Sequence, residues 1–156
     1  MRAVAISVSN RASAGVYEDR SGALLVQLLQ EAGAETADAT VIPDGIESVS
    51  AAIVSAVDSG ADVVITTGGT GLTDLDLTPE ATAGVLDREV PGIADAIRTY
   101  GAPAVPTAVL SRGLAGVRGR TLVVNLPGSS GGVRDGMAVL APLLAHTVDQ
   151  LHNGDH

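Results

Sequence analysis

The sequence predicts an α/β fold of three layers, αβα, in which helices cover both faces of a mostly parallel sheet. Short β-branched runs alternate with longer segments of helical periodicity, which is typical of successive β-α units. The run 62–67 is continuously apolar in its middle, as expected for a strand buried on both faces. With 156 residues and 46% hydrophobic content, the chain is long enough to bury a core, and we expect one domain over 1–156.

Apolar periodicity places the individual elements. Strands are expected over 4–8, 40–42 and 62–67, with a helix after each. The third helix has Thr78 as a hydroxyl N-cap, followed by Pro79 and Glu80 in its first turn. The remaining expectations are a helix over about 93–99, strands near 107–110 and 120–125, and a last helix that contains 139–148.

Composition excludes several kinds of chemistry. The chain has no cysteine and its nine basic residues are all arginines, so thiolate metal sites, Schiff bases and a P-loop lysine are excluded. A net charge of −9 and two aromatic residues argue against a nucleic-acid partner. An early polar turn and the lack of a long apolar run predict a cytoplasmic protein without membrane contact. His146, His152 and His156 are expected in a frayed, solvated tail rather than in catalysis.

The most informative segment is the run Gly68-Gly69-Thr70-Gly71, directly after the buried strand. Glycine reaches positive φ without strain, so such a loop can turn tightly and direct N–H groups at an anion at the ligand-binding edge of the sheet. The dinucleotide fingerprint lacks its third glycine and no lysine follows. The run therefore predicts a different phosphate-binding loop, and an ordinary strand-to-helix turn is the alternative.

Two aspartates are candidate magnesium ligands at the same edge. Asp76 lies between the glycine loop and the next helix, and Asp44 follows the strand at 40–42. Magnesium takes one or two carboxylates together with substrate oxygens. A solvated acidic loop is the alternative for Asp76. For Asp44 the alternative is a capping box with Glu47.

The segment 128–132 (GSSGG) satisfies the G-x-S-x-G pattern of a hydrolase nucleophile. No later strand is evident to present an acid and a histidine, and Pro127 interrupts the turn, so a second anion-binding loop fits better. Among the arginines near the last strands, Arg112 is the candidate for an anionic ligand, with solvated surface as the alternative.

Several motifs, in order and spacing, resemble the molybdopterin adenylyltransferase (Mog/MoaB) family of molybdenum cofactor assembly. The resemblance runs essentially from end to end. The segments that carry it are 7–10 (SVSN), 19–22 (DRSG), 43–44 (PD), 66–71 (TTGGTG), 76, 78–80 (TPE), 110–112 (LSR) and 125–128 (NLPG).

This resemblance implies a homotrimer that transfers the adenylyl group of Mg-ATP to the terminal phosphate of molybdopterin and releases pyrophosphate. It implies Mg²⁺ as cofactor, ATP and molybdopterin as substrates, and transient contact with a molybdenum insertase. It implies that Asp44 and Asp76 bind magnesium and take part in catalysis. The substrate-binding residues it implies are Ser9, Thr67, Gly68, Gly69, Thr70, Gly71, Ser111, Arg112, Asn125, Pro127 and Gly128, with Ser111 and Arg112 toward the pterin.

One position departs from the family pattern. The family usually carries arginine immediately before the aspartate, and here that residue is Leu75. The substitution removes a cation from a site that faces several phosphate charges. A noncatalytic pterin-binding or scaffold paralogue is therefore the alternative function.

Overall fold

The computed structural model describes residues 1–154, which form a six-stranded sheet in the order β2-β1-β3-β6-β5-β4. Four adjacent strands are parallel, and β5 pairs antiparallel with both of its neighbours. The predicted mostly parallel sheet is confirmed. The strands are β1 (Ala3–Val8), β2 (Thr40–Ile42), β3 (Val63–Thr67), β4 (Arg88–Glu89), β5 (Ala115–Arg118) and β6 (Thr121–Leu126).

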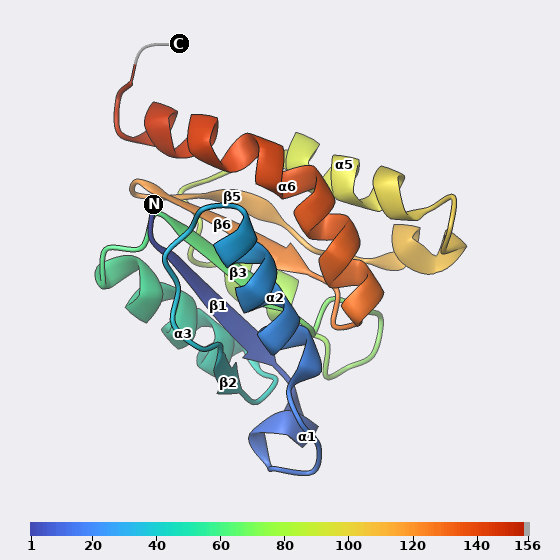
Figure 1. Ribbon diagram of the computed structural model, residues 1–156. Helices are drawn as coiled ribbons and strands as arrows, with labels where there is room; N and C mark the ends of the chain where they lie inside the picture. The colour runs from blue at the N-terminus through green and yellow to red at the C-terminus, as the bar shows by residue number, and fades with distance from the viewer. Residues whose placement is uncertain (155–156) are drawn as a thin grey trace.

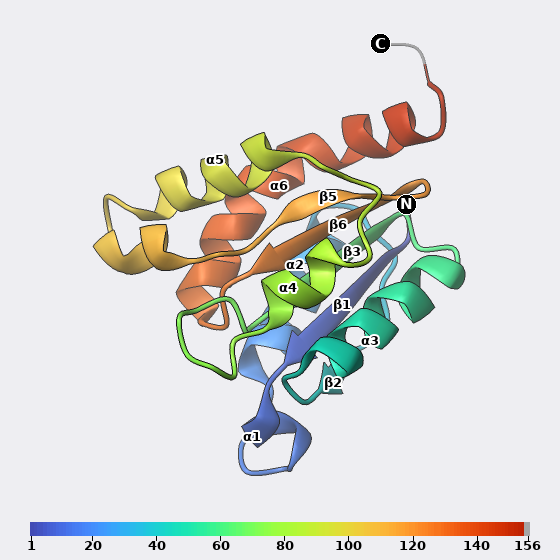
Figure 2. The same cartoon turned by 180° about the vertical axis from the view of Figure 1, so that it is seen from behind.

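Helices cover both faces of the sheet and give the predicted three layers (Figures 1 and 2). On one face lie α2 (Arg20–Glu31), α5 (Pro91–Gly101) and α6 (Ser130–Leu151), and on the other α3 (Ile46–Asp58) and α4 (Thr78–Ala83). The short helix α1 (Asn10–Ser13) projects beyond the end of β1, as Figure 1 shows.

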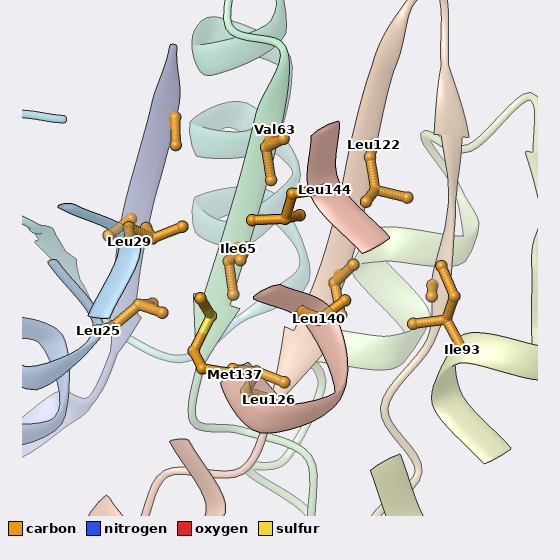
Figure 3. Close-up of a cluster of buried hydrophobic side chains, with 14 of the residues drawn as sticks. Leu25, Leu29, Val63, Ile65, Ile93, Leu122, Leu126, Met137, Leu140 and Leu144 are labelled. Atoms are coloured by element: carbon orange, nitrogen blue, oxygen red, sulfur yellow. The ribbon is translucent and has the colours of Figure 1, made fainter. Parts of the chain in front are cut away.

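Aliphatic side chains fill the core on each face of the sheet. The larger cluster, drawn in Figure 3, includes Leu29 of α2, Ile65 of β3 and Leu140 of α6, all fully buried. The smaller cluster packs Ile53 of α3 against Val64 of β3. Burying each such side chain contributes about 1.5–3 kcal/mol, and this core fixes the edge of the sheet from which the functional loops leave.

The strand expected at 107–110 is wrong. This stretch belongs to a 3₁₀ helix, η1 (Pro106–Leu110), in which Ala108 N donates to Val105 O at 2.9 Å. Pro106 fixes φ and offers no N–H to a sheet, and Val109 is 58% exposed, so the run has neither a ladder nor a core to join. The sheet position next to β6 is taken instead by β5, which the sequence analysis did not predict.

The N-cap expected at Thr78 is wrong, and the capping box that was the alternative for Asp44 is not formed. The N-cap of α4 is Leu77, while Thr78 lies inside the helix with its hydroxyl buried; Pro79 and Glu80 do stand in the first turn. The N-cap of α3 is Gly45, without a side-chain cap. Asp44 does not form the capping box because its carboxylate accepts a hydrogen bond from Asn10 N at 3.2 Å instead.

The end of the described chain is more ordered than expected. Helix α6 continues to Leu151, so His146 is helical, and His152 Nε2 lies 3.0 Å from Asp62 Oδ1. The frayed tail is therefore wrong for these two histidines, and His156 lies outside the described residues. Over residues 1–154, no helix combines the length and apolar character required to cross a membrane.

Candidate functional site: two hollows around the glycine loop

A hollow of about 920 Å³, here called the α1 hollow, opens at the carboxyl ends of β1 and β3. Ligands bind at this edge in open α/β sheets. Its walls come from α1, the first turn of α2 and the loops that follow β1, β2, β3 and β6. The lining residues used below are Ser9, Arg11, Tyr17, Glu18, Asp19, Arg20, Asp44, Thr67, Gly68, Gly69, Leu75, Asp76, Gly128 and Ser130.

A second hollow of about 620 Å³, the η1 hollow, lies on the other side of the glycine loop. Its lining is more apolar, with Val105, Ala108 and Leu110 around the 3₁₀ helix. Its other lining residues used below are Gly69, Thr70, Gly71, Leu72, Asp76, Ser111, Pro127 and Gly128. Gly69, Asp76 and Gly128 line both hollows, so ligands placed in them would meet at these three residues.

The glycine loop has a shape that side chains would prevent. Gly68 and Gly69 have φ of 102° and 69°, values that favour glycine. A β-carbon at Gly68 would collide with the carbonyl oxygen of Val8, and one at Gly69 with the hydroxyl of Thr78. The tight turn expected from the sequence is therefore present.

The loop after β6 supports the glycine loop. Gly68 N donates to Leu126 O at 3.0 Å, and Thr67 Oγ1 donates to Pro127 O at 2.7 Å. A β-carbon at Gly128 would stand 3.3 Å from Gly68 Cα, so the two backbones are in close contact. Both glycine-bearing loops thus form one continuous floor at the edge of the sheet.

Asp44 and Asp76 both face the α1 hollow, and each carboxylate is held by one oxygen. Asp44 Oδ2 accepts from Asn10 N, while Asn10 Oδ1 accepts from Asp44 N at 2.9 Å. Asp76 Oδ2 accepts from Thr73 N at 3.0 Å and from Thr73 Oγ1 at 2.8 Å. Among the described residues, neither Oδ1 has a hydrogen-bond partner, which leaves both oxygens for a ligand or a metal ion.

These two carboxylates fit magnesium better than a metal that requires a complete protein cage. Residues 1–154 contain no group of three or more His, Cys, Asp or Glu side chains placed to hold a metal. Magnesium accepts one or two carboxylates and completes its shell with water and phosphate oxygens. Asp44 and Asp76 would therefore hold it only together with a ligand.

The guanidinium of Arg112 fastens the segment between the glycine loop and α4. Nε donates to Gly71 O at 2.8 Å, Nη2 donates to Asp76 O at 2.6 Å, and Nη1 pairs with the carboxylate of Glu80. The hydrogen bond from Arg112 lowers the pKa of Glu80, and the same bond raises the pKa of Arg112. Arg112 lines neither hollow, so its cation is engaged by the chain itself.

Asn125 lies beneath the floor of the site and is only 4% exposed. Its Nδ2 donates to Thr66 Oγ1 at 3.0 Å and to Thr82 Oγ1 at 2.9 Å, and its Oδ1 accepts from Leu114 N at 3.1 Å. These bonds connect β3, α4 and the chain before β5. Like Arg112, Asn125 lines neither hollow, and its contacts hold the elements that carry the loops.

The other predicted site residues divide between the two hollows. Ser9, Thr67 and Gly68 line the α1 hollow; Thr70, Gly71, Ser111 and Pro127 line the η1 hollow. Sequence reasoning missed the wall formed by Arg11, Tyr17 and Arg20. The motifs at 7–10 and 19–22 were the signal, because the first directly precedes Arg11 and the second contains Arg20.

The hydrolase pattern has no partners for a triad. Ser129 caps α6 by accepting from Gly132 N at 3.0 Å, and Ser130 begins that helix. Neither His146 nor His152 lines either hollow. The described residues therefore offer these serines no histidine base.

A mostly parallel sheet with two hollows that meet at glycine-bearing loops defines the class of the protein, an αβα protein with a candidate small-molecule site at the carboxyl ends of its strands. Residues 4–146 match the family model described as "Probable molybdopterin binding domain". The chain belongs to this molybdenum cofactor biosynthesis family.

Curated relatives carry corresponding names. A "Molybdopterin adenylyltransferase" of Helicobacter pylori is 36% identical over 92% of this chain and 84% of its own length. A "Molybdenum cofactor biosynthesis bifunctional protein" of Synechococcus elongatus is 40% identical over 99% of this chain. The chain spans 48% of that protein, and thus about half the length of such bifunctional relatives.

A solved structure shows the same architecture. The molybdopterin biosynthesis Mog protein from Mycobacterium ulcerans has 49% sequence identity and a TM-score of 0.91. The match covers 96% of this chain and 98% of that one. The α/β fold of the present chain is therefore the fold of Mog and MoaB proteins.

Proposed function

We propose that this chain is a molybdopterin adenylyltransferase, which uses Mg-ATP to convert molybdopterin to adenylyl-molybdopterin and so prepares it for metal insertion. One observation carries the proposal: Gly69, Asp76 and Gly128 line both hollows, so two substrates can meet at one point. The curated relative with this name supplies the reaction class.

The chemistry suits the residues present. An oxygen of the terminal phosphate of molybdopterin attacks the α-phosphorus of ATP, the bond from that phosphorus to the bridging oxygen breaks, and pyrophosphate leaves with the bonding electrons. Such transfers depend on positioning and charge neutralisation more than on covalent catalysis. Mg²⁺, held by Asp44 and Asp76 with phosphate oxygens, would neutralise part of the charge on the leaving pyrophosphate.

A difference between the linings of the two hollows supports a separate substrate for each. Leu72, Val105 and Leu110 give the η1 hollow apolar walls that suit the flat pterin, with Ser111 at its edge. The α1 hollow has charged walls, in which Arg11 and Arg20 can meet the phosphates of a nucleotide while Asp44 and Asp76 hold its magnesium ion. The glycine-bearing loops, with Thr67, Thr70 and Pro127, then bind the phosphates between them.

The proposal extends to assembly and location. We place the chain, as one domain over 1–156, in a cytoplasmic homotrimer that passes its product to a molybdenum insertase. Val109 and Leu110 are 58% and 49% exposed next to the η1 hollow, and an interface there would cover them. Light scattering at micromolar concentration tests the trimer, and a purely monomeric protein contradicts it.

The reaction is tested by mixing the purified chain with Mg-ATP and molybdopterin and by chromatography of the products. The expected result is adenylyl-molybdopterin and pyrophosphate in equal amounts, with loss of both in Asp76→Asn. Tight pterin binding without product contradicts the enzyme. It would support the second candidate, a noncatalytic pterin-binding scaffold, which the uncharged Leu75 in the α1 hollow favours.

A further inference from the structure

The positive charge available to the site is limited. The chain has nine arginines and no lysine. The guanidiniums of four arginines donate to oxygen atoms of the chain itself: Arg2, Arg98, Arg112 and Arg118. Arg11 and Arg20, in contrast, line the α1 hollow, and neither guanidinium has a hydrogen bond or ion pair within residues 1–154.

The backbone that carries Arg11 is firmly held. Ser9 caps α1 by accepting from Ala12 N at 3.2 Å, and Arg11 O accepts from Val16 N at 2.9 Å. The paired bonds between Asn10 and Asp44 tie the same helix to the loop after β2. The backbone of Arg11 is therefore held in place, while its guanidinium is free to bind a ligand.

Arg20 is placed in a comparable way at the start of α2. The preceding residue, Asp19, is the N-cap, and its Oδ1 accepts from Gly22 N at 3.0 Å and from Ser7 Oγ at 2.7 Å. Ser21 Oγ donates to Gly128 O at 2.6 Å and joins this turn to the floor of the site. The second free guanidinium thus starts from a turn that is anchored to β1 and to the glycine-bearing loop.

The carboxylates of the hollow do not neutralise these two arginines. Four carboxylates line the same hollow, those of Glu18, Asp19, Asp44 and Asp76, yet none forms an ion pair with Arg11 or Arg20 in the described chain. The hollow as a whole is not cationic, but its two guanidiniums are unpaired and so offer a phosphate positively charged donors that no carboxylate occupies. Arginine is also suited to bind phosphate through two parallel hydrogen bonds.

We infer that Arg11 and Arg20 form a phosphate-binding subsite on the wall of the α1 hollow. This inference rests on the proposed function, because it takes a phosphate-bearing substrate as the ligand of that hollow. The shared chemistry is a phosphate group, which either the nucleotide or the pterin can supply. Since Leu75 adds no charge to this hollow, the two arginines carry the attraction for that phosphate.

The test measures binding by titration calorimetry for the wild type, Arg11→Gln and Arg20→Gln, with Mg-ATP, adenosine and molybdopterin as separate ligands. The matched control is Arg120→Gln, because Arg120 is exposed in the turn before β6. It therefore lies at the amino end of that strand, at the other end of the sheet from the hollow. Each hollow variant should lose about ten-fold in affinity for the phosphate ligand and little for adenosine. An unchanged melting temperature confirms that the variants fold.

The arms of the experiment separate the possible outcomes. Weaker Mg-ATP binding identifies the nucleotide as the source of the phosphate, and weaker molybdopterin binding identifies the pterin. Equal affinity of wild type and both variants for both ligands overturns the subsite, while product formation by the same variants would leave the proposed function standing. A wild type that binds neither phosphate ligand overturns both proposals.

Discussion

The hydroxyl of Thr78 occupies the space in which a side chain at Gly69 would lie. Thr78 N also donates to Gly69 O at 3.1 Å, and Thr78 Oγ1 is buried without a hydrogen-bond partner in the described chain. The first turn of α4 and the glycine loop are therefore in direct contact. The position of this loop depends on the absence of a β-carbon at residue 69.

Gly69→Ala should destabilise the fold by about 1–3 kcal/mol, because alanine is strained at a φ of 69° and its methyl group meets Thr78. Urea unfolding measures the change. Thr78→Ala should relieve part of the loss when combined with Gly69→Ala, as a double-mutant cycle would show. Gly92→Ala is the control, since a β-carbon there has no neighbour within 4 Å. Equal stability of Gly69→Ala and wild type would contradict the contact.

Arg112→Gln should loosen the segment that carries Asp76. The substitution leaves Gly71 O and Asp76 O without their charged donor and removes the partner of Glu80. We expect faster amide hydrogen exchange in residues 71–76 and a fall in kcat of about ten-fold or more, since small displacements of catalytic groups are costly. Unchanged exchange and kcat would show that the guanidinium is dispensable; Arg120→Gln again serves as the control.

The ion pair between Arg112 and Glu80 should make stability depend on acid pH. Arg112 lowers the pKa of Glu80 in the folded state, so the pair stabilises the fold above the ordinary Glu pKa and loses this effect as pH falls through the lowered value. Both side chains are partly exposed, so screening limits the effect to under about 1 kcal/mol. Urea unfolding as a function of acid pH should show a smaller loss in Glu80→Gln than in the wild type; parallel curves would contradict the coupling.

Leu75→Arg should strengthen nucleotide binding. Leu75 is 62% exposed and lines the α1 hollow, so an arginine there needs no rearrangement of the core. One added charge-assisted hydrogen bond to phosphate is expected to improve the Kd for Mg-ATP about ten-fold. Leu72→Arg, at an exposed position that lines the η1 hollow instead, is the control. An equal gain from both variants would indicate general charge attraction rather than a local contact.

Asn125→Ala should cost about 1–3 kcal/mol of unfolding free energy, because it leaves Leu114 N and Thr66 Oγ1 without a buried partner. Thr82 Oγ1 loses its bond from Asn125 but still donates to Thr78 O. Denaturant unfolding measures this loss. If Asn125 acts through the loops it supports, kcat should fall while KM for each substrate changes little. A variant with wild-type stability would show that water replaces the amide.

The sequence was informative wherever burial and local chemistry agree. The apolar run of β3 predicted both the strand and the loop that leaves it, because a strand buried on two faces needs no alternation. β5 was missed because Ala115 and Gly116 have weak strand preference and become a strand only by pairing with β6 and β4. The run 107–110 was wrongly predicted as a strand for the opposite reason. Its threonine and valine favour strands, but Pro106 has no N–H to donate and Val109 is exposed, so the run does not pair with another strand.

The site shows the same division. The glycine loop and both aspartates were identifiable from their places after strands, since the ends of parallel strands meet at one edge. The bonds of Asp44 to Asn10 and of Arg112 to Glu80 join residues more than thirty positions apart, and local spacing does not contain that information. The wall of Arg11 and Arg20 was missed because the sequence does not show which exposed arginines line a hollow.

The hydrogen bonds from Arg112 to Gly71 O and Asp76 O affect which residues of this protein tolerate substitution. Both ends of the segment 71–76 are fixed through their carbonyl oxygens, while Leu72 and Leu75 between them are exposed and line the η1 hollow and the α1 hollow, respectively. Substitutions at these two positions can therefore accumulate without displacing the carboxylate of Asp76. Residues in this segment can therefore be substituted, in divergent evolution or in the laboratory, to alter ligand preference while the rest of the fold stays the same.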